Sequence, residues 1–524
     1  MKIGNKITAI ALLWLIFVNS GLITSADTFR RLGMSHAWWT GTEELVRGNT
    51  LIVKVNDKKY IPYDLGQSML MLPGDWLGEH LGKGFENELV KEHFREIVVS
   101  FLIFIPINLL TILTCFRFLC LLNYSETIAG LSSLVWLIRT SVLFYSSFHQ
   151  QNNQILLFVL VSYQAALMYV LKNQKLWAIL SGAALGFAFI IRITNILYVA
   201  SILTFLVGCI LSQERTKQRL KSVRSVLLWT SGFIPFVLLE RVLSYVRYGS
   251  WRATSVSLHL QIYNKVDTLA NSSAVVEGVT QGFPFIKLLT KVQPEALFAP
   301  LFSPEKSIFI YDPLLLPCLI LLIICWKFLS QYIKWYAIAT IIGFLLHLYI
   351  YSWTFEWIDQ VEWGARYHVT SIHLLLIPLI PLLVKGAIEQ TNINGKFFQK
   401  ILILIAKIVL IMAVLIQFTS IILPPGLEAH QKKLNIGSKF YVKQRISNVF
   451  YMLDPNPNFQ ISELEQNLTP HSLDSKVIWN LLPFRYQNKI QPYSYLKKFI
   501  PMLFIAWSII FIAAISTTIW IFIE

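Results

Sequence analysis

The chain has 524 residues, of which 55% are hydrophobic and only 14% are charged. A soluble globular domain carries about 25% charged residues, so this composition argues against one, and repeated runs of about 18 or more apolar residues indicate a multi-span membrane protein. The formal net charge of +16 would also suit nucleic-acid binding, but basic loops that set the orientation of a membrane protein are the simpler explanation.

The first apolar stretch, residues 7–26, resembles a signal peptide with a cleavage site before Asp27. It is long enough to cross the hydrocarbon core, so we expect a retained first helix. With eleven further apolar segments, the sequence predicts an all-α integral membrane protein with about twelve transmembrane helices. The later segments are 97–119, 127–148, 153–171, 176–191, 196–212, 225–246, 308–329, 336–354, 370–386, 400–423 and 499–522.

The basic connections all fall on one side of this arrangement, together with the N-terminal lysines. Basic loops stay in the cytoplasm, so both termini are expected there, in what is predicted to be a bacterial plasma (inner) membrane. The basic connections are 172–175, 213–224 and 385–400, and the segments on the opposite, extracytoplasmic side are 27–96, 247–307, 355–369 and 424–498.

This topology divides the chain into a core, an external segment and a last helix. Residues 1–423 form the predicted core, in which 27–96 and 247–307 are large external loops. Residues 424–498 form an external segment whose role the sequence leaves open, and 499–524 hold the last transmembrane helix.

Polar residues near the external helix ends are the candidates for function, because charge at membrane depth is costly. Asp27 ends the first span, and His149 and Gln150 lie on the turn after the third. Arg192 occupies a tight turn between two short spans, and Lys306 precedes the eighth span. A further group surrounds the stretch EWGARYH, namely Glu356, Asp359, Glu362, Arg366, Tyr367 and His368.

These residues also have structural explanations. An Arg at a helix end commonly extends to the lipid head groups, and this is the expectation for Arg241 and Arg247, with Glu240 pairing with one of them. Glu362 and Arg366 could likewise be an ordinary pair that ties a loop to a helix end.

Together, the candidates predict one external site with carboxylates and guanidinium groups at the membrane boundary. Arg forks bind phosphate through paired hydrogen bonds, and a neighbouring carboxylate can act as a general base. A lipid phosphate arriving from the bilayer fits this chemistry, either as a polyprenyl-linked sugar or, less specifically, as an anionic lipid to be recognised.

Several stretches resemble the GT-C superfamily of membrane glycosyltransferases, the enzymes related to protein mannosyltransferases and to the lipid A aminoarabinose transferase. An Asp follows the first span and opens a large external loop, as in that family. No single motif is specific, but the order and the topology match from about residue 7 to 385. The similar stretches are YDLGQSMLMLPGDWLG (63–78), LSGAALGFAFIIRITNIL (180–197), SYVRYGSW (244–251), LFSPEKSIFIYDPLLL (301–316) and EWGARYHVTSIHLLLIPL (362–379).

The resemblance implies a polyprenyl-phosphate sugar donor, a glycan, lipid or protein acceptor, and inversion at the anomeric carbon. Asp27 would then be the catalytic general base. Arg192 and Arg366, with Lys306 behind them, would bind the donor phosphate. The residues expected to line the substrate are Tyr63, His149, Gln150, Glu356, Asp359, Glu362, Tyr367 and His368.

Within EWGARYH, each residue has an expected part. Trp363 is expected to anchor at the membrane interface and Gly364 to let the backbone bend. Glu362 is expected to orient Arg366 toward the donor phosphate, with Tyr367 near the sugar.

Two departures from the family leave the cofactor open. Family members often carry two adjacent acids in the first loop, whereas Asp27 is followed by the non-acidic residues 28–31. The turn after the third span, FHQQNNQ, also lacks an acid. No metal ligands are therefore assigned, and dependence on a divalent metal is left open.

The main alternative is a transporter or flippase of lipid-linked sugars. It should place polar groups near the membrane centre on broken helices, whereas most of the candidates here gather at one end of the bundle. Arg139 is the strongest feature in its favour, because it either faces a water-filled cavity or marks a span drawn incorrectly. An oligosaccharide polymerase or ligase is a third class, which the early Asp and the LGQSMLMLP loop fit less well.

Overall fold

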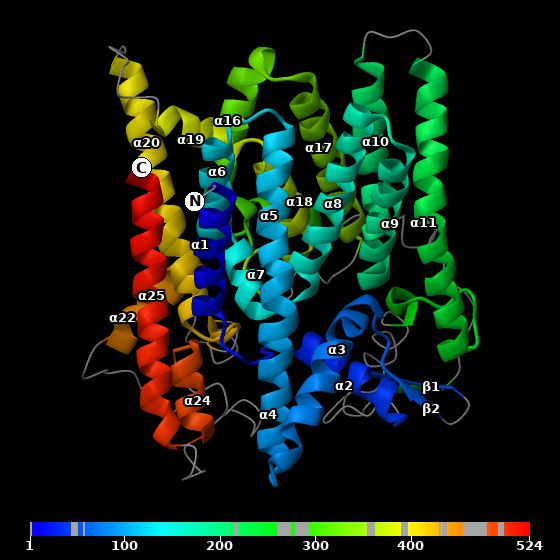
Figure 1. Ribbon diagram of the computed structural model, residues 1–524, viewed down its shortest axis with the longest axis vertical. Helices are drawn as coiled ribbons and strands as arrows, with labels where there is room; N and C mark the ends of the chain where they lie inside the picture. The colour runs from blue at the N-terminus through cyan, green and yellow to red at the C-terminus, as the bar shows by residue number, and fades with distance from the viewer. Residues whose placement is uncertain are drawn as a thin grey trace.

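The main body of the protein is a bundle of apolar helices (Figure 1). Among the residues that the structure describes, six helices are long and apolar enough to cross a membrane, or up to eight if each of two bent pairs is one span. The computed structural model describes residues 3–42, 51–55, 58–213, 218–258, 274–277, 293–353, 362–388, 397–428, 431, 438–453, 479–490 and 497–523.

Every predicted apolar segment overlaps a helix or a bent helix pair of the bundle. The helical assignment is thus confirmed, and the number of twelve crossings remains a prediction. The bent pairs are α6 (Glu126–Arg139) with α7 (Val142–Phe148), bent by 60°, and α18 (Arg366–Leu376) with α19 (Ile380–Ile388), bent by 50°. The other helices of the bundle are α1 (Ile3–Val18), α5 (Ile105–Leu121), α8 (Gln151–Lys172), α9 (Lys175–Ile191), α10 (Tyr198–Leu211), α11 (Gln218–Tyr248), α16 (Leu315–Cys325), α17 (Gln331–Tyr351), α20 (Phe397–Ile422) and α25 (Ile500–Ile523).

Burial differs sharply between the helices, as expected for a bundle in lipid. In the most apolar stretch of α8, 72% of the residues are buried, so α8 forms the centre. The corresponding values are 22% for α11 and 6% for α25, which stand at opposite edges of the bundle (Figure 1). Apolar surface of this extent is unfavourable in water, and it indicates that lipid surrounds these helices.

The described part of the loop predicted to be the first external one folds into a small unit at one end of the bundle (Figure 1). It contains α2 (Ala26–Thr40), α3 (Gly66–Leu81) and α4 (Glu88–Val99), and α4 continues through η2 (Ser100–Phe104) into α5. Two strands, β1 (Leu51–Val55) and β2 (Lys58–Tyr60), pair in antiparallel fashion.

A third strand qualifies the all-α prediction. β3 (Ala274–Glu277), from the second external loop, pairs in parallel with β1, giving the order β2-β1-β3. The β-branched residues of LIVKV and AVVE favour strands, but their pairing joins two loops that are distant in the sequence. The sheet therefore links the two large loops that are predicted to be external.

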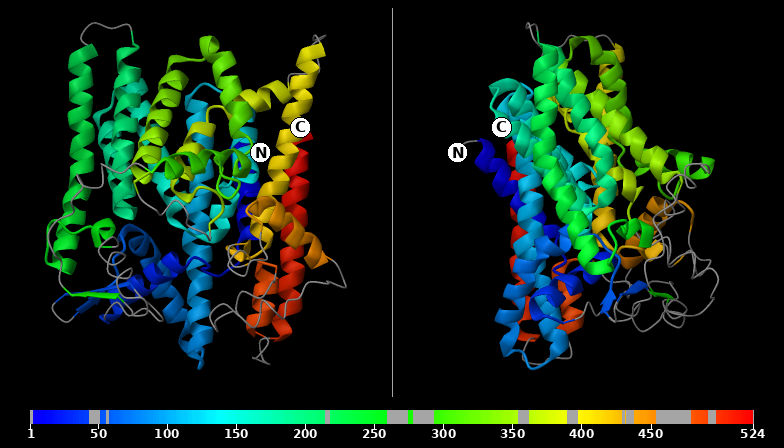
Figure 2. Two further views of the ribbon diagram at one scale, coloured as in Figure 1. Left: turned by 180° about the vertical axis from the view of Figure 1, so that it is seen from behind. Right: turned by 90° about the vertical axis from the view of Figure 1, so that its right-hand side faces the viewer.

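Part of the segment 424–498 packs at this same end of the bundle. The views in Figure 2 place α24 (Leu482–Ile490) beside α25. The remaining described elements are η1 (Gly82–Gly84), η3 (Ile193–Leu197), α14 (Pro294–Phe302), α15 (Ile308–Tyr311), η4 (Trp326–Phe328), α22 (Tyr441–Leu453) and η8 (Lys497–Phe499).

Candidate functional site

Asp27 lies in the first turn of α2, where a carboxylate is favoured by the helix dipole. Its Oδ2 accepts a hydrogen bond from Arg366 Nη2 at 2.9 Å, and its Oδ1 accepts one from Tyr63 Oη at 2.8 Å. The side chain of Asp27 is 25% exposed. The structure thus brings together three residues that the sequence predicted for one site, and it leaves the Asp27 side chain partly exposed.

Arg366 bridges two carboxylates. Besides Asp27, its guanidinium contacts Glu362, with 2.7 Å between Arg366 Nη1 and Glu362 Oε1. Gln150 Nε2 donates to the same Glu362 oxygen at 2.5 Å. Lys306 Nζ donates to the backbone carbonyl of Glu362 at 2.8 Å. The expected pairing of Glu362 with Arg366 is present, and Gln150 and Lys306 hold Glu362 in place.

The backbone of EWGARYH bends at Gly364, as predicted, because its φ of +71° is a conformation that other residues rarely adopt. The prediction that Trp363 anchors at the interface is wrong. Trp363 is 4% exposed and packs against Tyr311 and Phe144. Aromatic residues from α15 and α7 surround the ring, so it is part of the core.

Segment 424–498 reaches this loop through Arg445 on α22. The Arg445 guanidinium lies 5.3 Å from the centroid of the Trp363 ring. It pairs with Glu428 at 2.8 Å and donates to backbone carbonyls at the end of α20, including Thr419 and Ser420. The described part of the segment therefore packs over the loop that carries Arg366.

Tyr63 is held by the irregular chain before α3. Arg247 donates to the backbone carbonyls of Tyr63 at 3.2 Å and of Ile61 at 2.9 Å. Arg247 is buried, so its predicted extension to lipid head groups is wrong, because these buried carbonyls require a donor. Arg241 likewise bonds within the protein and pairs with Glu240, which confirms the expected role of Glu240.

The LGQS sequence at the start of α3 packs against two turns of the bundle, one at the end of α9 and one after α7. A Cβ at Gly66 would lie 2.6 Å from the backbone nitrogen of Ile191, so only glycine allows α3 this close to the end of α9. Gln67 Nε2 donates to the carbonyl of His149 at 3.0 Å. These contacts place Tyr63 next to the turn that carries Arg192.

His149 and His368 are packed within the fold. The His149 ring stacks on Phe104 at 4.6 Å, and its Nε2 lies 2.6 Å from Ser100 Oγ. The His368 ring, 1% exposed, packs edge-on against Tyr351 of α17. Both rings therefore join helices, and neither forms a polar contact with Asp27 among the interactions of the described residues.

Tyr367 separates two of the predicted phosphate-binding cations. The guanidinium of Arg192 lies 5.3 Å from the Tyr367 ring centroid, and that of Arg366 lies 5.2 Å from it. The ring also stacks on Tyr351 at 4.4 Å. Tyr367 is therefore fixed between the cations, and its place near the substrate stays a prediction.

Sequence reasoning missed two charged residues of this site. Arg31 is 4% exposed, and its guanidinium lies 4.4 Å from the centroid of the Tyr63 ring. Asp64 Oδ1 accepts a hydrogen bond from Ser255 Oγ at 2.6 Å. The spacing of Arg31 from Asp27, four residues on one helix, places both on the same face and could have revealed Arg31. No comparable signal pointed to Asp64, which lies outside any helix.

The environments of the two carboxylates shift their pKa values in opposite directions. Burial alone would raise the pKa of Asp27, but the guanidinium groups of Arg366 and Arg31 outweigh it and hold that pKa well below its usual range. Burial raises the pKa of Asp64, and the hydrogen bond from Ser255 only partly opposes the shift. Such divergence is typical of sites that use carboxylates in different roles.

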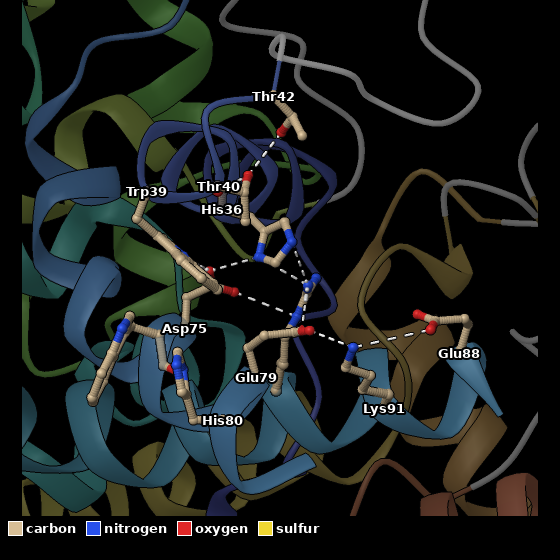
Figure 3. Close-up of polar contacts among 11 residues, drawn as sticks. His36, Trp39, Thr40, Thr42, Asp75, Glu79, His80, Glu88 and Lys91 are labelled. Atoms are coloured by element: carbon tan, nitrogen blue, oxygen red, sulfur yellow. Dashed lines mark hydrogen bonds and ion pairs between the residues drawn. The ribbon is translucent and has the colours of Figure 1, made fainter. Parts of the chain in front are cut away.

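A separate polar network fixes the far end of α2 (Figure 3). Asp75 of α3 is fully buried and accepts a hydrogen bond from Trp39 Nε1 at 2.7 Å. His36 Nδ1 lies 2.9 Å from the same oxygen of Asp75. Lys91 of α4 pairs with Glu79 of α3 (Figure 3). These contacts set the direction of α2 and hence the positions of Asp27 and Arg31 at its start.

The break between α6 and α7 carries a second buried polar cluster. Ser141 Oγ donates to Asp312 Oδ2 at 2.6 Å and lies 2.9 Å from His373 Nε2. Arg139 ends α6 just before this break, with its guanidinium 5.8 Å from the Phe522 ring centroid. The third predicted span is therefore interrupted at this point.

Two predicted substrate-lining residues, Glu356 and Asp359, lie outside the described residues. Within the part of the chain that the structure describes, no three or more His, Cys, Asp or Glu residues are grouped so that they could hold a metal ion. The carboxylates of Asp27 and Glu362 are instead bound to Arg366.

Neither a scan of protein-family models nor a search of curated proteins found a match to this chain. The family resemblance accordingly rests on the motifs and their order alone.

Proposed function

We propose that this protein is a membrane glycosyltransferase that transfers a sugar from a polyprenyl-phosphate donor to an acceptor hydroxyl on the extracytoplasmic face. The observation that carries the proposal is the Asp27 carboxylate, whose side chain is partly exposed, oriented by Tyr63 and Arg366, and placed at one end of an apolar bundle. A carboxylate in this position can meet both a lipid carrier and a polar acceptor.

The proposed reaction is a single displacement. The acceptor oxygen attacks the anomeric carbon, and its proton passes to Asp27. The bond from that carbon to the phosphate oxygen breaks, and its electron pair leaves with the polyprenyl phosphate. Preorganised cations stabilise the negative charge that develops there. Attack opposite the leaving group inverts the anomeric centre.

The low pKa of Asp27 limits how the surrounding groups can assist catalysis. It keeps the carboxylate ionised, which readies it to accept a proton but limits its basicity. In this mechanism Tyr63 and Arg366 mainly orient the carboxylate, because a well-placed base is effective even when its pKa is not matched to the operating pH.

The test uses purified protein in nanodiscs with a panel of polyprenyl-phosphate sugars. Release of free polyprenyl phosphate is followed with and without a cell-envelope extract as acceptor. We expect acceptor-dependent release, with opposite anomeric configurations in donor and product. Tight donor binding without release for every sugar and acceptor fraction would argue against the proposal.

A flippase of lipid-linked sugars is the second candidate, and one observation favours it. The buried cluster of Ser141, Asp312 and His373 lies where α6 and α7 meet at a break, and broken helices with internal polar groups are typical of transporters. The candidate predicts that proteoliposomes translocate a fluorescent polyprenyl-phosphate sugar without sugar release. It also predicts that Asp312→Asn abolishes translocation, whereas Asp27→Asn has no effect on it.

A further inference from the structure

Arg31 is a buried cation whose nearest carboxylates, Asp27 and Asp64, act on it from beyond ion-pair distance. It is 4% exposed, yet its guanidinium forms no hydrogen bond or ion pair with any residue that the structure describes. Of its three nitrogens, only Nε is fully enclosed without a partner, so the terminal nitrogens are the ones that an approaching group can reach. An unpaired charge is costly to bury, and its presence beside Asp27 therefore points to a ligand.

Arg192 repeats this pattern from another element. It is partly exposed, and its guanidinium contacts the face of Tyr367 but forms no hydrogen bond or ion pair among the described residues. Burial lowers the pKa of Arg31, and the neighbouring charge of Arg192 acts in the same direction. The carboxylates of Asp27 and Asp64 offset part of this repulsion. Neither forms an ion pair with Arg31 or Arg192 among the described residues, so a phosphate at contact distance would give these cations a direct partner.

The other predicted phosphate ligands are already occupied. Arg366 contacts Asp27 at 2.9 Å and Glu362 at 2.7 Å, so its single positive charge is already neutralised by two carboxylates. Lys306 Nζ is 2.8 Å from the carbonyl of Glu362, and the residue is 3% exposed. Arg366 and Lys306 therefore have fewer free donors and less uncompensated charge for binding a phosphate than Arg31 and Arg192.

We propose that Arg31 and Arg192 form an anion subsite for the phosphate of a lipid-linked substrate, and that Arg366 acts as a positioning residue for Asp27. Guanidinium groups suit phosphate oxygens because their planar forks donate paired hydrogen bonds. The faces of Tyr63 and Tyr367 hold the two cations through cation–π contacts. The lipid part of this assignment rests on the proposed function, whereas the anion chemistry is shared by free phosphate.

The test compares binding to the full-length protein in nanodiscs of polyprenyl phosphate, neutral polyprenol and inorganic phosphate. Arg31→Met removes the charge at similar volume, and Arg31→Lys keeps the charge without the fork. Arg252→Met, at an exposed external arginine, is the matched control. We expect Arg31→Met to weaken polyprenyl-phosphate binding about 10- to 100-fold, as loss of a charged hydrogen bond does.

The other variants and ligands have expected results of their own. Arg31→Lys should fall between Arg31→Met and the wild type, and the control should be unchanged. Polyprenol should bind equally to all variants. Inorganic phosphate that competes at millimolar concentration identifies free phosphate as a ligand of the subsite, whereas failure to compete shows that the subsite requires the lipid.

Thermal stability without ligand separates binding from a structural role. Arg31→Met should be as stable as the wild type or more stable, because the cost of burying the Arg31 charge outweighs its attraction to Asp27. Arg366→Met should be less stable, because Asp27 and Glu362 lose their shared partner. Unchanged polyprenyl-phosphate affinity in Arg31→Met, or misfolding of that variant, would overturn the proposal.

The two proposals fail in different ways. If no sugar is ever released but phosphate-dependent binding is lost in Arg31→Met, the anion subsite stands and the glycosyltransferase is rejected. If sugar is transferred and Arg31→Met binds the donor as tightly as the wild type, the enzyme stands and the subsite is rejected.

Discussion

Replacing Asp27 by asparagine tests the proposed base with little change of shape. In Asp27→Asn, the amide oxygen can still accept the hydrogen bond from Tyr63, which spans 2.8 Å in the wild type. The amide nitrogen then faces Arg366, whose Nη2 lies 2.9 Å from the carboxylate oxygen that it replaces. Two donors thus meet where an ion pair existed, and the side chain no longer accepts a proton.

The two losses have different sizes. The lost charged hydrogen bond should cost about 1.5–3 kcal/mol of stability, partly offset because Arg366 keeps its contact with Glu362 at 2.7 Å. The lost proton acceptor should lower the rate about 10²- to 10⁴-fold, which corresponds to about 3–5 kcal/mol of activation free energy.

Glu362→Gln is the matched control, because it weakens the other ion pair of Arg366 and leaves the base intact. Turnover of both variants is measured as release of polyprenyl phosphate, together with thermal midpoints in detergent. We expect similar midpoints, but a rate loss for Glu362→Gln of about 10-fold, the lower end for a positioning group. A folded Asp27→Asn variant with wild-type turnover refutes the reasoning, and equal rate losses in both variants assign the effect to Arg366.

Three further predictions concern stability. Gly364→Ala should cost about 1–2 kcal/mol, because φ is +71° and the added Cβ lies 3.1 Å from Tyr311 Cβ; an unchanged thermal midpoint contradicts this. Arg445→Met should cost about 3–5 kcal/mol by leaving Glu428 buried without its ion pair, and a midpoint equal to that of the wild type would show that this pair does not hold α22. Folding lowers the pKa of Asp27. The ionised carboxylate therefore stabilises the folded protein at pH values above the unfolded-state pKa of about 4, and this contribution is lost as the pH falls through the lowered folded-state pKa. The midpoint difference between wild type and Asp27→Asn should therefore be constant from about pH 8 to 5 and shrink only in stronger acid; a difference that closes near neutral pH contradicts the shift.

The sequence by itself determined the helical framework and several contacts within it. Apolar segment length located the helices, because crossing lipid requires a long apolar run whatever the neighbours are. The closeness of Glu362 and Arg366 in the sequence predicted their pairing, and the bend at Gly364 just before α18 brings the two side chains together. The position of Asp27 after the first apolar segment predicts that it lies at the membrane boundary.

Only the tertiary structure decided which charges match each other. Arg366 pairs with Asp27, which lies 339 residues away in the sequence. The motif had assigned the Arg366 charge to the donor phosphate, but in the structure Asp27 engages it. Trp363 was placed at the interface by residue type, but neighbours from distant helices bury it. Periodicity and motifs report the local chain, whereas burial and charge balance depend on which segments meet in space. That is why the folded structure was needed to show that Arg31 is buried without a hydrogen bond or ion pair among the described residues.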